Sequence, residues 1–385
     1  MPANTTLEVV RVKQASSKFP AAAVALALGL IIPATARPQA TPAQRVGAIK
    51  SVAKQSSPVL VAFAPQGGTA GSPSNEAAPK EAGPKSVTFY SEGLKLVGDL
   101  YLPENIPVGE KRAGIVLCYG YTGSRKLYLP DTARALVAAG YVVLTFDYKG
   151  WGESEGSRTR LAPYSRVADA QAALTFLSIQ PQVDPNRLGI YGSSYGGSTA
   201  IWTSAIDQRV KCTVAVIAVG NGLKWMRSVR RPDDFADLME RSAADRVKRV
   251  QTGKSELVER GEVLMADRKS AAISSAQRQS TGPGLVTKIP LEYIDDTAGF
   301  NPEWVVDKIS PRPVLFITTD DDRIAPSEQS ENMFARAGEP KKLVMLKGYG
   351  HYELYSGEAF KQMAGATLSW FRQYLPAHAE NNNAH

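Results

Sequence analysis

The stretch RLGIYGSSYGGSTAIWTSAI, residues 187–206, places a short apolar run, a glycine-rich turn and a helix-like segment in immediate succession. Within it, Gly192-Ser193-Ser194-Tyr195-Gly196 fits the pattern Gly-x-Ser-x-Gly with Ser194 at its centre. A pattern centred on Ser193 would need glycines at positions 191 and 195, and both are tyrosines. Because glycines leave room for a sharp strand-to-helix turn, the stretch predicts that Ser194 stands at the tip of that turn.

Strand-like and helix-like segments alternate along the chain after residue 85. A hairpin is predicted over 86–102, where two alternating segments flank a Ser-Glu-Gly turn. Short apolar runs that predict further strands lie at 113–120, 141–150, 187–192, 212–220, 313–320 and 342–348. Helical patterns lie at 131–140, 165–178 and 329–338. Such alternation predicts an α/β fold with a mostly parallel sheet that is covered by helices on both faces.

Residues 221–295 interrupt this alternation. The segment is charged and helix-like at first, and it becomes loop-like near STGPGLVTKIP, residues 280–290. An insertion between two strands of such a sheet is expected to lie over its carboxyl edge, where α/β proteins bind ligands. We therefore predict a cap over the binding site.

The turn at Ser194 and the alternation around it resemble the α/β-hydrolase fold over about residues 86–375. The resemblance implies a core formed by 86–220 and 296–376, with 221–295 as a helical cap insertion. It also implies a serine hydrolase similar to esterases and Xaa-Pro-peptidase-like hydrolases. In that family an acidic residue and then a histidine follow the serine along the chain.

One histidine fits the position that the resemblance requires. The chain has three histidines, and His378 and His385 fall in the polar segment 377–385, which we expect to be a disordered tail. His351 lies in GYGHYELY, just after the last predicted strand, where the family carries its catalytic histidine. A serine hydroxyl needs a base that works near neutral pH, so His351 is predicted to be that base.

The acidic partner is predicted within FITTDDDRIAP, which offers three consecutive aspartates at 320–322. In the family the acid usually stands four residues before a proline in this loop, and Pro326 then selects Asp322. Asp321 remains the alternative. The acid is expected to hold the histidine in the correct tautomer and to stabilise its cation.

The resemblance also implies an oxyanion hole of two backbone N–H groups. The first is that of Tyr195, and the second comes from the loop CYGYTGSRK, residues 118–126, with Tyr121 as the expected donor. Tyr119 stands where the family usually has histidine, which leaves open how this loop is held. Asp147 and Ser154, in DYKGWGESEG, are expected to stabilise a neighbouring loop rather than to take part in chemistry.

Residues that face the substrate are harder to assign. Tyr119 is one candidate, and Trp225, Met226 and Arg227 follow the sixth predicted strand, where substrate-facing residues often lie. Lys and Arg outnumber Asp and Glu in the cap. Its basic character would suit an anionic acyl or alcohol group, but a solvated helix face with i,i+4 pairs would have the same composition.

The N-terminal region has a different character. The chain carries a net charge of +8, but residues 1–85 hold nine Lys/Arg against three Asp/Glu, a net +6, which leaves only +2 for the rest. A nucleic-acid binder should carry its basic charge on the folded part, and this chain carries little there.

Basic residues before an apolar run that ends in Ala34-Thr35-Ala36 predict a signal peptide over 1–36. They also predict export to the periplasm or medium, with an uncleaved membrane anchor as the alternative. Residues 37–85 are predicted to be a flexible linker.

These patterns predict a serine hydrolase that cleaves carboxylic esters through an acyl-enzyme. The same residues would also serve an amidase, a peptidase or an acyltransferase, and a non-catalytic binding protein on this fold is a third hypothesis. We expect a small-molecule ester or amide as partner, neither nucleic acid nor a stable membrane partner, and no cofactor or metal ion. Cys118 and Cys212, in apolar runs, are expected to be buried free thiols.

Overall fold

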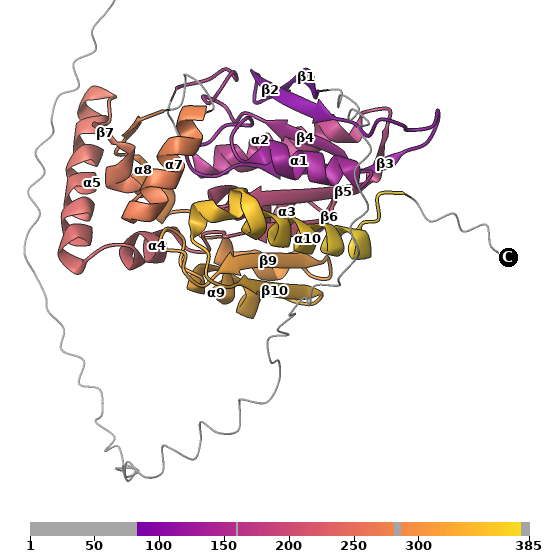
Figure 1. The fold of residues 1–385 in the computed structure, drawn as a ribbon. Helices are drawn as coiled ribbons and strands as arrows, with labels where there is room; N and C mark the ends of the chain where they lie inside the picture. Colours follow the sequence, from indigo (N-terminus) through magenta and orange to yellow (C-terminus); the bar gives the residue numbers. More distant parts are fainter. Residues whose placement is uncertain (1–82, 159–160, 281–285, 379–385) are drawn as a thin grey trace, which may run out of the picture. The chain divides into compact units, whose positions relative to one another are not determined.

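The computed structural model describes residues 83–158, 161–280 and 286–378, all within one compact unit, Gly67–His385 (Figure 1). The predicted signal peptide, the linker up to residue 82 and residues 379–385 lie outside the described residues. Among the described helices, none is long and apolar enough to cross a membrane. The described residues begin just before the first strand.

One eight-stranded sheet forms the centre of this unit, in the order β1-β2-β4-β3-β5-β6-β9-β10. β1 pairs antiparallel with β2, and β2 pairs antiparallel with β4, while the other neighbours are parallel. The strands are β1 (Lys85–Ser91), β2 (Leu94–Tyr101), β3 (Arg112–Cys118), β4 (Val142–Phe146), β5 (Val183–Ser193), β6 (Val210–Val216), β9 (Val314–Thr319) and β10 (Lys341–Leu346). This is the mostly parallel sheet that the alternating pattern predicts.

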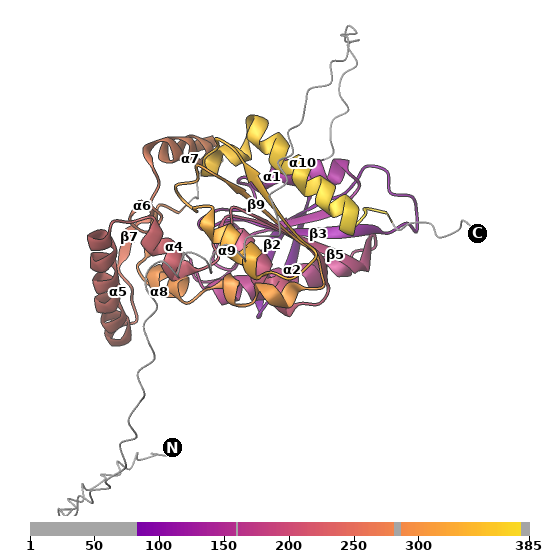
Figure 2. The same cartoon turned by 90° about the horizontal axis from the view of Figure 1, so that it is seen from below.

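Helices cover both faces of the sheet. α1 and α10 lie on one face, and α2, α3 and α9 lie on the other (Figure 2). Their bounds are α1 (Leu129–Ala138), α2 (Pro163–Ser178), α3 (Tyr195–Ile206), α9 (Glu328–Arg336) and α10 (Gly357–Tyr374), and a 3₁₀ turn η4 (His351–Tyr355) precedes α10. Because both faces are covered, the central strands β3, β4 and β9 are buried along their whole length.

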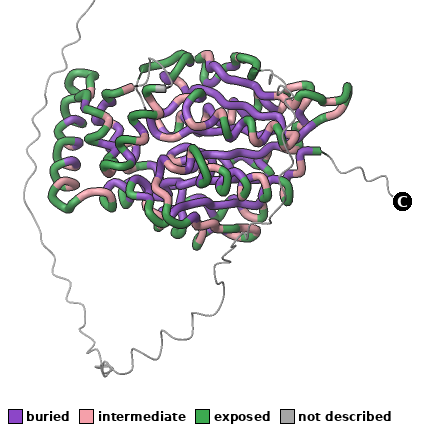
Figure 3. Tube along the Cα trace, in the orientation of Figure 1, coloured by how far each residue is buried: buried purple, intermediate pink, exposed green. Residues whose placement is uncertain are grey.

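The segment between β6 and β9 forms the cap. Its elements are α4 (Gly222–Ser228), α5 (Pro232–Thr252), β7 (Leu257–Glu259), α6 (Arg260–Val263), α7 (Arg268–Ser280), β8 (Lys288–Pro290) and α8 (Tyr293–Ala298), and the 3₁₀ turns η2 (Pro302–Trp304) and η3 (Val306–Ile309) lead back to the sheet. In Figure 1, α5, α7 and α8 gather at one end of the sheet. Figure 3 shows that α5 is exposed along most of its length, whereas most of the strands are buried.

The chain end differs from the expected tail. Ala377 is buried, and its carbonyl oxygen accepts the N–H of Ala113 at 2.9 Å. His378 Nδ1 lies 2.9 Å from Glu110 Oε1. These two residues therefore belong to the folded part, and a tail can begin only after them.

Candidate active site

Ser194 occupies a sharp turn between β5 and α3. Its backbone has φ 57° and ψ −129°, a strained conformation that a non-glycine residue adopts only when the surroundings enforce it. The chain packs tightly here: a Cβ added to Gly192 would lie 2.0 Å from the carbonyl oxygen of Gly196, and one added to Gly196 would lie 2.1 Å from that of Cys118. The glycines are therefore required by backbone contact, and together they hold Ser194 at the end of the strand.

Ser194, His351 and Asp322 form a continuous hydrogen-bonded chain. The Nε2 atom of His351 lies 3.1 Å from Ser194 Oγ, and its Nδ1 atom lies 2.6 Å from Asp322 Oδ2. His351 opens η4 after β10, and Asp322 lies in the loop after β9. The parallel strands β5, β9 and β10 therefore deliver the three groups to the same edge of the sheet. His351 and Asp322 are both buried, which protects these hydrogen bonds from water.

The three consecutive aspartates have different surroundings. Asp322 Oδ1 accepts the backbone N–H groups of Ile324 and Ala325, both at 2.8 Å, so the carboxylate is fixed in the orientation that faces the histidine. Asp321 is exposed and pairs with Arg323 at 3.2 Å. Asp320 accepts the N–H of Gly348 at 2.7 Å. Asp322 is the aspartate that contacts His351.

The loop after β3 lies against Ser194. A Cβ added to Gly120 would lie 3.1 Å from the Ser194 Cβ and 3.5 Å from its Oγ. Within the described parts of the chain, the backbone N–H groups of Tyr121 and Tyr195 donate no hydrogen bond. Two backbone N–H groups that have no acceptor in the described residues therefore lie beside Ser194, one in the residue that follows it and one in the loop after β3.

Arg166 of α2 holds this loop in place, and it was not among the residues predicted from the sequence. Its guanidinium donates to the carbonyl oxygens of Gly120 at 3.0 Å and Tyr121 at 2.8 Å, and it is almost completely buried. It also lies over the rings of Tyr119, Tyr148 and Trp151, with the nearest centroid, that of Tyr148, at 4.5 Å. A signal was present, because Arg166 falls beside Val167 on the buried stripe of α2, where a charged residue needs a specific partner.

A second set of contacts fixes the far end of the same loop. Asp147 accepts the backbone N–H of Arg125 at 2.8 Å and that of Glu153 at 3.1 Å, and its carboxylate pairs with the Arg125 guanidinium. Ser154 donates to the carbonyl oxygen of Asp147 at 2.6 Å. Asp147 and Ser154 thus have structural contacts, and Arg125 links them to the loop beside Ser194.

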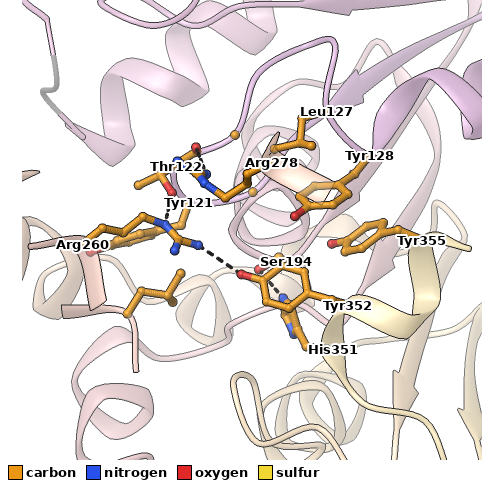
Figure 4. Close-up of a pocket in the computed structure, with 13 residues that line it drawn as sticks. Tyr121, Thr122, Leu127, Tyr128, Ser194, Arg260, Arg278, His351, Tyr352 and Tyr355 are labelled. Atoms are coloured by element: carbon orange, nitrogen blue, oxygen red, sulfur yellow. Dashed lines mark hydrogen bonds between the residues drawn. The ribbon is translucent and has the colours of Figure 1, made fainter. Parts of the chain in front are cut away.

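A pocket opens at the Ser194 hydroxyl (Figure 4). Its lining combines the loop after β3, three side chains of the cap and a group of tyrosines: Gly120, Tyr121, Thr122, Gly123, Leu127, Tyr128, Ser194, Arg260, Leu264, Arg278, His351, Tyr352 and Tyr355. The tyrosines pack on one another, with the ring centroids of Tyr128 and Tyr355 4.2 Å apart. This lining contains two arginines and no carboxylate, so its charge is positive.

The residues that we expected to face the substrate lie outside this lining. Tyr119 is buried, and its hydroxyl accepts the N–H of Tyr148 at 3.1 Å. Trp225 and Met226 are buried, and the indole N–H of Trp225 donates to the carbonyl oxygen of Ile324 at 2.6 Å, beside Asp322. Arg227 is exposed. Trp225 therefore supports the loop that carries the aspartate, and the pocket is lined by other cap residues.

The described residues also show how metal-ligating groups and thiols are arranged. They contain no cluster of three or more His, Cys, Asp or Glu side chains that could hold a metal ion. Cys118 and Cys212 are free and buried, and burial raises the pKa of the Cys118 thiol to about 12. This thiol is therefore protonated at neutral pH and is a poor nucleophile.

The sheet order, the strained serine and the flanking helices define an α/β hydrolase. The chain belongs to the family described as serine aminopeptidase, S33, whose model matches residues 109–356. This match includes Ser194, Asp322 and His351.

Curated relatives match most of the chain. An uncharacterized 31.7 kDa protein from the traX-finO intergenic region of Escherichia coli is 30% identical over 73% of this chain and 98% of its own length. The quorum-quenching protein AidA of Acinetobacter baumannii is 26% identical over 76% of this chain and 96% of its own. The thiohydrolase aneE of Aspergillus aculeatus is 28% identical over 74% of this chain and 91% of its own.

Solved structures share the fold. The crystal structure of the alpha/beta hydrolase GrgF from Penicillium matches with a TM-score of 0.63 and 22% identity, over 76% of this chain and 98% of that chain. Another, of a hypothetical protein from Pseudomonas aeruginosa, matches with a TM-score of 0.66 and 23% identity, over 80% of this chain and all of that one.

Proposed function

We propose that this protein is a serine hydrolase that cleaves carboxylic esters through an acyl-enzyme intermediate. The observation that carries the proposal is the hydrogen-bonded chain from Ser194 Oγ through His351 to Asp322, with contacts of 3.1 Å and 2.6 Å. Membership of a hydrolase family supports it.

In the proposed reaction His351 is the general base. With the Nδ1–H donating to Asp322, the Nε2 lone pair accepts the proton of Ser194 as its oxygen forms a bond to the ester carbonyl carbon. The resulting imidazolium then gives this proton to the leaving alkoxide, and the acyl group stays on the serine. Water enters next and loses a proton to the same Nε2 atom while its oxygen bonds to the acyl carbon. The bond from this carbon to Ser194 Oγ then breaks, Nε2 returns the proton to Oγ, and a carboxylic acid leaves the regenerated serine.

The carbonyl oxygen gains negative charge in both tetrahedral intermediates. We assign the backbone N–H groups of Tyr121 and Tyr195 as the donors that stabilise this charge, because both flank Ser194 and neither has another acceptor in the described residues. Such donors need no reorganisation during the reaction if their backbone is held rigidly. The Arg166 contacts to the carbonyl oxygens of Gly120 and Tyr121 supply that support.

Labelling with a fluorophosphonate tests the nucleophile and the class of reaction together. The purified protein is incubated with the probe, digested and mapped by mass spectrometry, and it is also assayed with esters and amides of graded acyl size. We expect a single adduct on Ser194 and turnover of esters. An unlabelled Ser194, or an adduct with amide turnover and no ester turnover, would reject the proposal.

Thioesters are a second class of acyl donor. The relative named thiohydrolase, 28% identical over most of both chains, favours their inclusion, and the proposed steps are the same with a thiolate as leaving group. The alternative of acyl transfer is checked in the same assay by adding an alcohol. If transfer dominates, the yield of product ester rises with alcohol concentration at the expense of free acid.

Replacing Arg166 is expected to lower turnover by weakening the support of the oxyanion donors. For Arg166→Met we expect kcat to fall by about tenfold to a hundredfold, less than the loss of a whole donor, with a smaller change in KM. Arg166→Lys keeps the positive charge but lacks the planar fork that donates to both carbonyl oxygens, so it should recover part of the rate. Steady-state kinetics measure the split between kcat and KM, and circular dichroism confirms folding. A positioning role would be contradicted if kcat fell and KM rose by the same factor and the variant no longer showed a cooperative unfolding transition.

A further inference from the structure

The pocket at the Ser194 hydroxyl is small. Its volume is about 30 Å³. On the same measure one water molecule needs about 10–15 Å³, so the pocket has room for about two or three non-hydrogen atoms. An acyl chain that places this many atoms beyond its carbonyl group is a propanoyl or a butanoyl chain.

Aromatic rings that pack on one another form one wall of this pocket. The rings of Tyr128 and Tyr355 stack with their centroids 4.2 Å apart and their planes at 25°. The ring of Tyr352 packs against both, with centroid distances of 5.8 Å and 6.3 Å. In Figure 4 the rings of Tyr128 and Tyr355 lie across the pocket from Arg260. Each ring would lose these contacts if it moved aside, so the wall resists displacement by a longer chain.

Hydrogen bonds hold two of the three rings at their hydroxyl ends. The Tyr355 hydroxyl forms a hydrogen bond of 2.8 Å with that of Ser193, beside the proposed nucleophile. The Tyr352 hydroxyl accepts a hydrogen bond of 3.1 Å from Arg260, and the Tyr352 side chain is buried. The wall is therefore tied to the turn after β5 on one side and to the cap on the other.

Tyr128 has a strained backbone. Its φ of 69° and ψ of −26° are a left-handed conformation that a tyrosine adopts only when its surroundings enforce it. Few non-glycine positions in the described part of the chain have a positive φ, and Ser194 is another of them. Such positions cluster at ligand-binding sites. The strain at Tyr128 therefore supports a role in shaping the pocket.

Two leucines confine the pocket further. Leu127 precedes Tyr128, and Leu264 directly follows α6 of the cap. Both side chains are buried, and both line the pocket. Apolar side chains at these points suit a hydrocarbon chain, which needs no hydrogen-bond partner.

In the proposed reaction the acyl group stays bonded to Ser194 after the alcohol has left, so the pocket at this hydroxyl is the place for the acyl chain. A longer chain would have to displace packed rings, and overpacking of such a wall is unfavourable. We propose that Tyr128, Tyr352 and Tyr355 limit the acyl chain, so that the preferred substrates are esters of short-chain acids, from acetyl to butanoyl. The word ester rests on the proposed function, whereas the size limit is tested separately below.

The first experiment compares nitrophenyl esters with acyl chains from acetyl to octanoyl. We expect kcat/KM to be highest between acetyl and butanoyl and to fall by about tenfold or more from butanoyl to hexanoyl, as for other groups too large for a rigid pocket. A second series keeps the acetyl group and lengthens the alcohol, and there we expect no comparable fall. A limit on the alcohol side alone would assign the pocket to the leaving group and overturn the inference.

Variants connect the limit to the walls of the pocket. Tyr128→Ala removes a ring on the core side, and Leu264→Ala opens the cap side. Each should raise kcat/KM for hexanoyl relative to butanoyl by about tenfold. A merely structural role would slow all esters by the same factor. If both variants fold and keep the wild-type order of chain lengths, the inference is wrong.

Tyr374→Ala is the matched control for Tyr128→Ala. The ring of Tyr374 also packs on an aromatic side chain, that of Trp370, with centroids 4.4 Å apart, and it lies outside the pocket lining. This variant should keep the wild-type profile of chain lengths. Thermal unfolding of all three variants separates a loss of stability from a change in selectivity.

Alkylboronic acids measure the size limit without turnover. Ser194 Oγ bonds to boron, its proton passes to His351, and the boron becomes tetrahedral. Nothing leaves, so the adduct forms whether the substrate is an ester or an amide. Calorimetry with the wild-type protein should show a fall in affinity of about tenfold or more from propylboronic to pentylboronic acid, which match butanoyl and hexanoyl. Tyr128→Ala should reduce this difference.

The two experiments separate the size limit from the proposed function. Ester turnover that does not depend on acyl length, or equal affinities for the two boronic acids, would overturn the inference while ester hydrolysis stands. Graded binding of the boronic acids without turnover of any ester would reject the proposed function and keep the size limit. Absence of both turnover and boronic acid binding would reject both.

Discussion

Replacing Ser194 by alanine is expected to reduce kcat for ester hydrolysis by at least about a thousandfold, with little change in KM. The hydroxyl is the proposed nucleophile, and its removal leaves only the backbone donors and the pocket to assist attack by water. The fold should be unaffected, because the strained backbone at this position is held by contacts of the neighbouring glycines. The measurement is steady-state kinetics with an activated ester, together with thermal unfolding.

Ser193 offers a matched control one residue away. It is buried, and its hydroxyl forms a hydrogen bond of 2.8 Å with that of Tyr355. Ser193→Ala should therefore lower the free energy of unfolding by about 1–3 kcal/mol, since the Tyr355 hydroxyl loses its partner, and it should retain most of the activity. If instead Ser193→Ala abolished turnover and Ser194→Ala did not, the nucleophile would be misassigned.

Asp322→Asn is the second exchange with a very large expected effect. The asparagine oxygen can still accept from Ile324 and Ala325, so its NH₂ group would face the Nδ1 atom of His351. The imidazole would then adopt the tautomer with hydrogen on Nε2 and could no longer accept the serine proton. We expect a fall in kcat of about ten-thousandfold at neutral pH, by the tautomer effect known for such triads.

Asp321→Asn is the appropriate comparison, because it makes the same chemical change at an exposed position whose partner is Arg323. This variant should retain its rate within about twofold, as surface ion pairs contribute little. A large loss in Asp321→Asn with a normal rate in Asp322→Asn would assign the acid to the neighbouring residue. Crystal structures or proton NMR of the imidazole would then locate the hydrogen bond.

The sheet could be predicted from the sequence because its strands are continuous apolar runs that alternate with helices. The same holds for the place of Ser194, since backbone crowding makes Gly192 and Gly196 necessary. A proline in a fixed relation to the acidic residue favoured Asp322 over Asp321, and the contact with His351 is at Asp322 in the structure. The first two features depend on local patterns that a single sequence contains, whereas the proline rule that selected Asp322 comes from the resemblance to the α/β-hydrolase family.

The pocket could not be predicted in the same way. Arg260 and Arg278 are separated by 18 positions and lie on different helices, and only the packing of the cap brings both to Thr122. Trp225 was expected to face the substrate, but its indole N–H bonds to the carbonyl of Ile324, which turns the ring into the protein. Side-chain direction in such an insertion depends on tertiary contacts that leave no periodic signal.

The contacts of Thr122 have a consequence for exchanging parts between related enzymes. Its hydroxyl and its carbonyl oxygen are both bonded to cap arginines, so the cap contributes directly to the surroundings of the adjacent Tyr121 amide. A chimaera whose foreign cap lacks Arg260 and Arg278 would keep Ser194, His351 and Asp322. Its loop after β3 would still lose the two hydrogen bonds that the cap donates to Thr122. Grafts intended to change selectivity should therefore retain both arginines or supply substitutes for them.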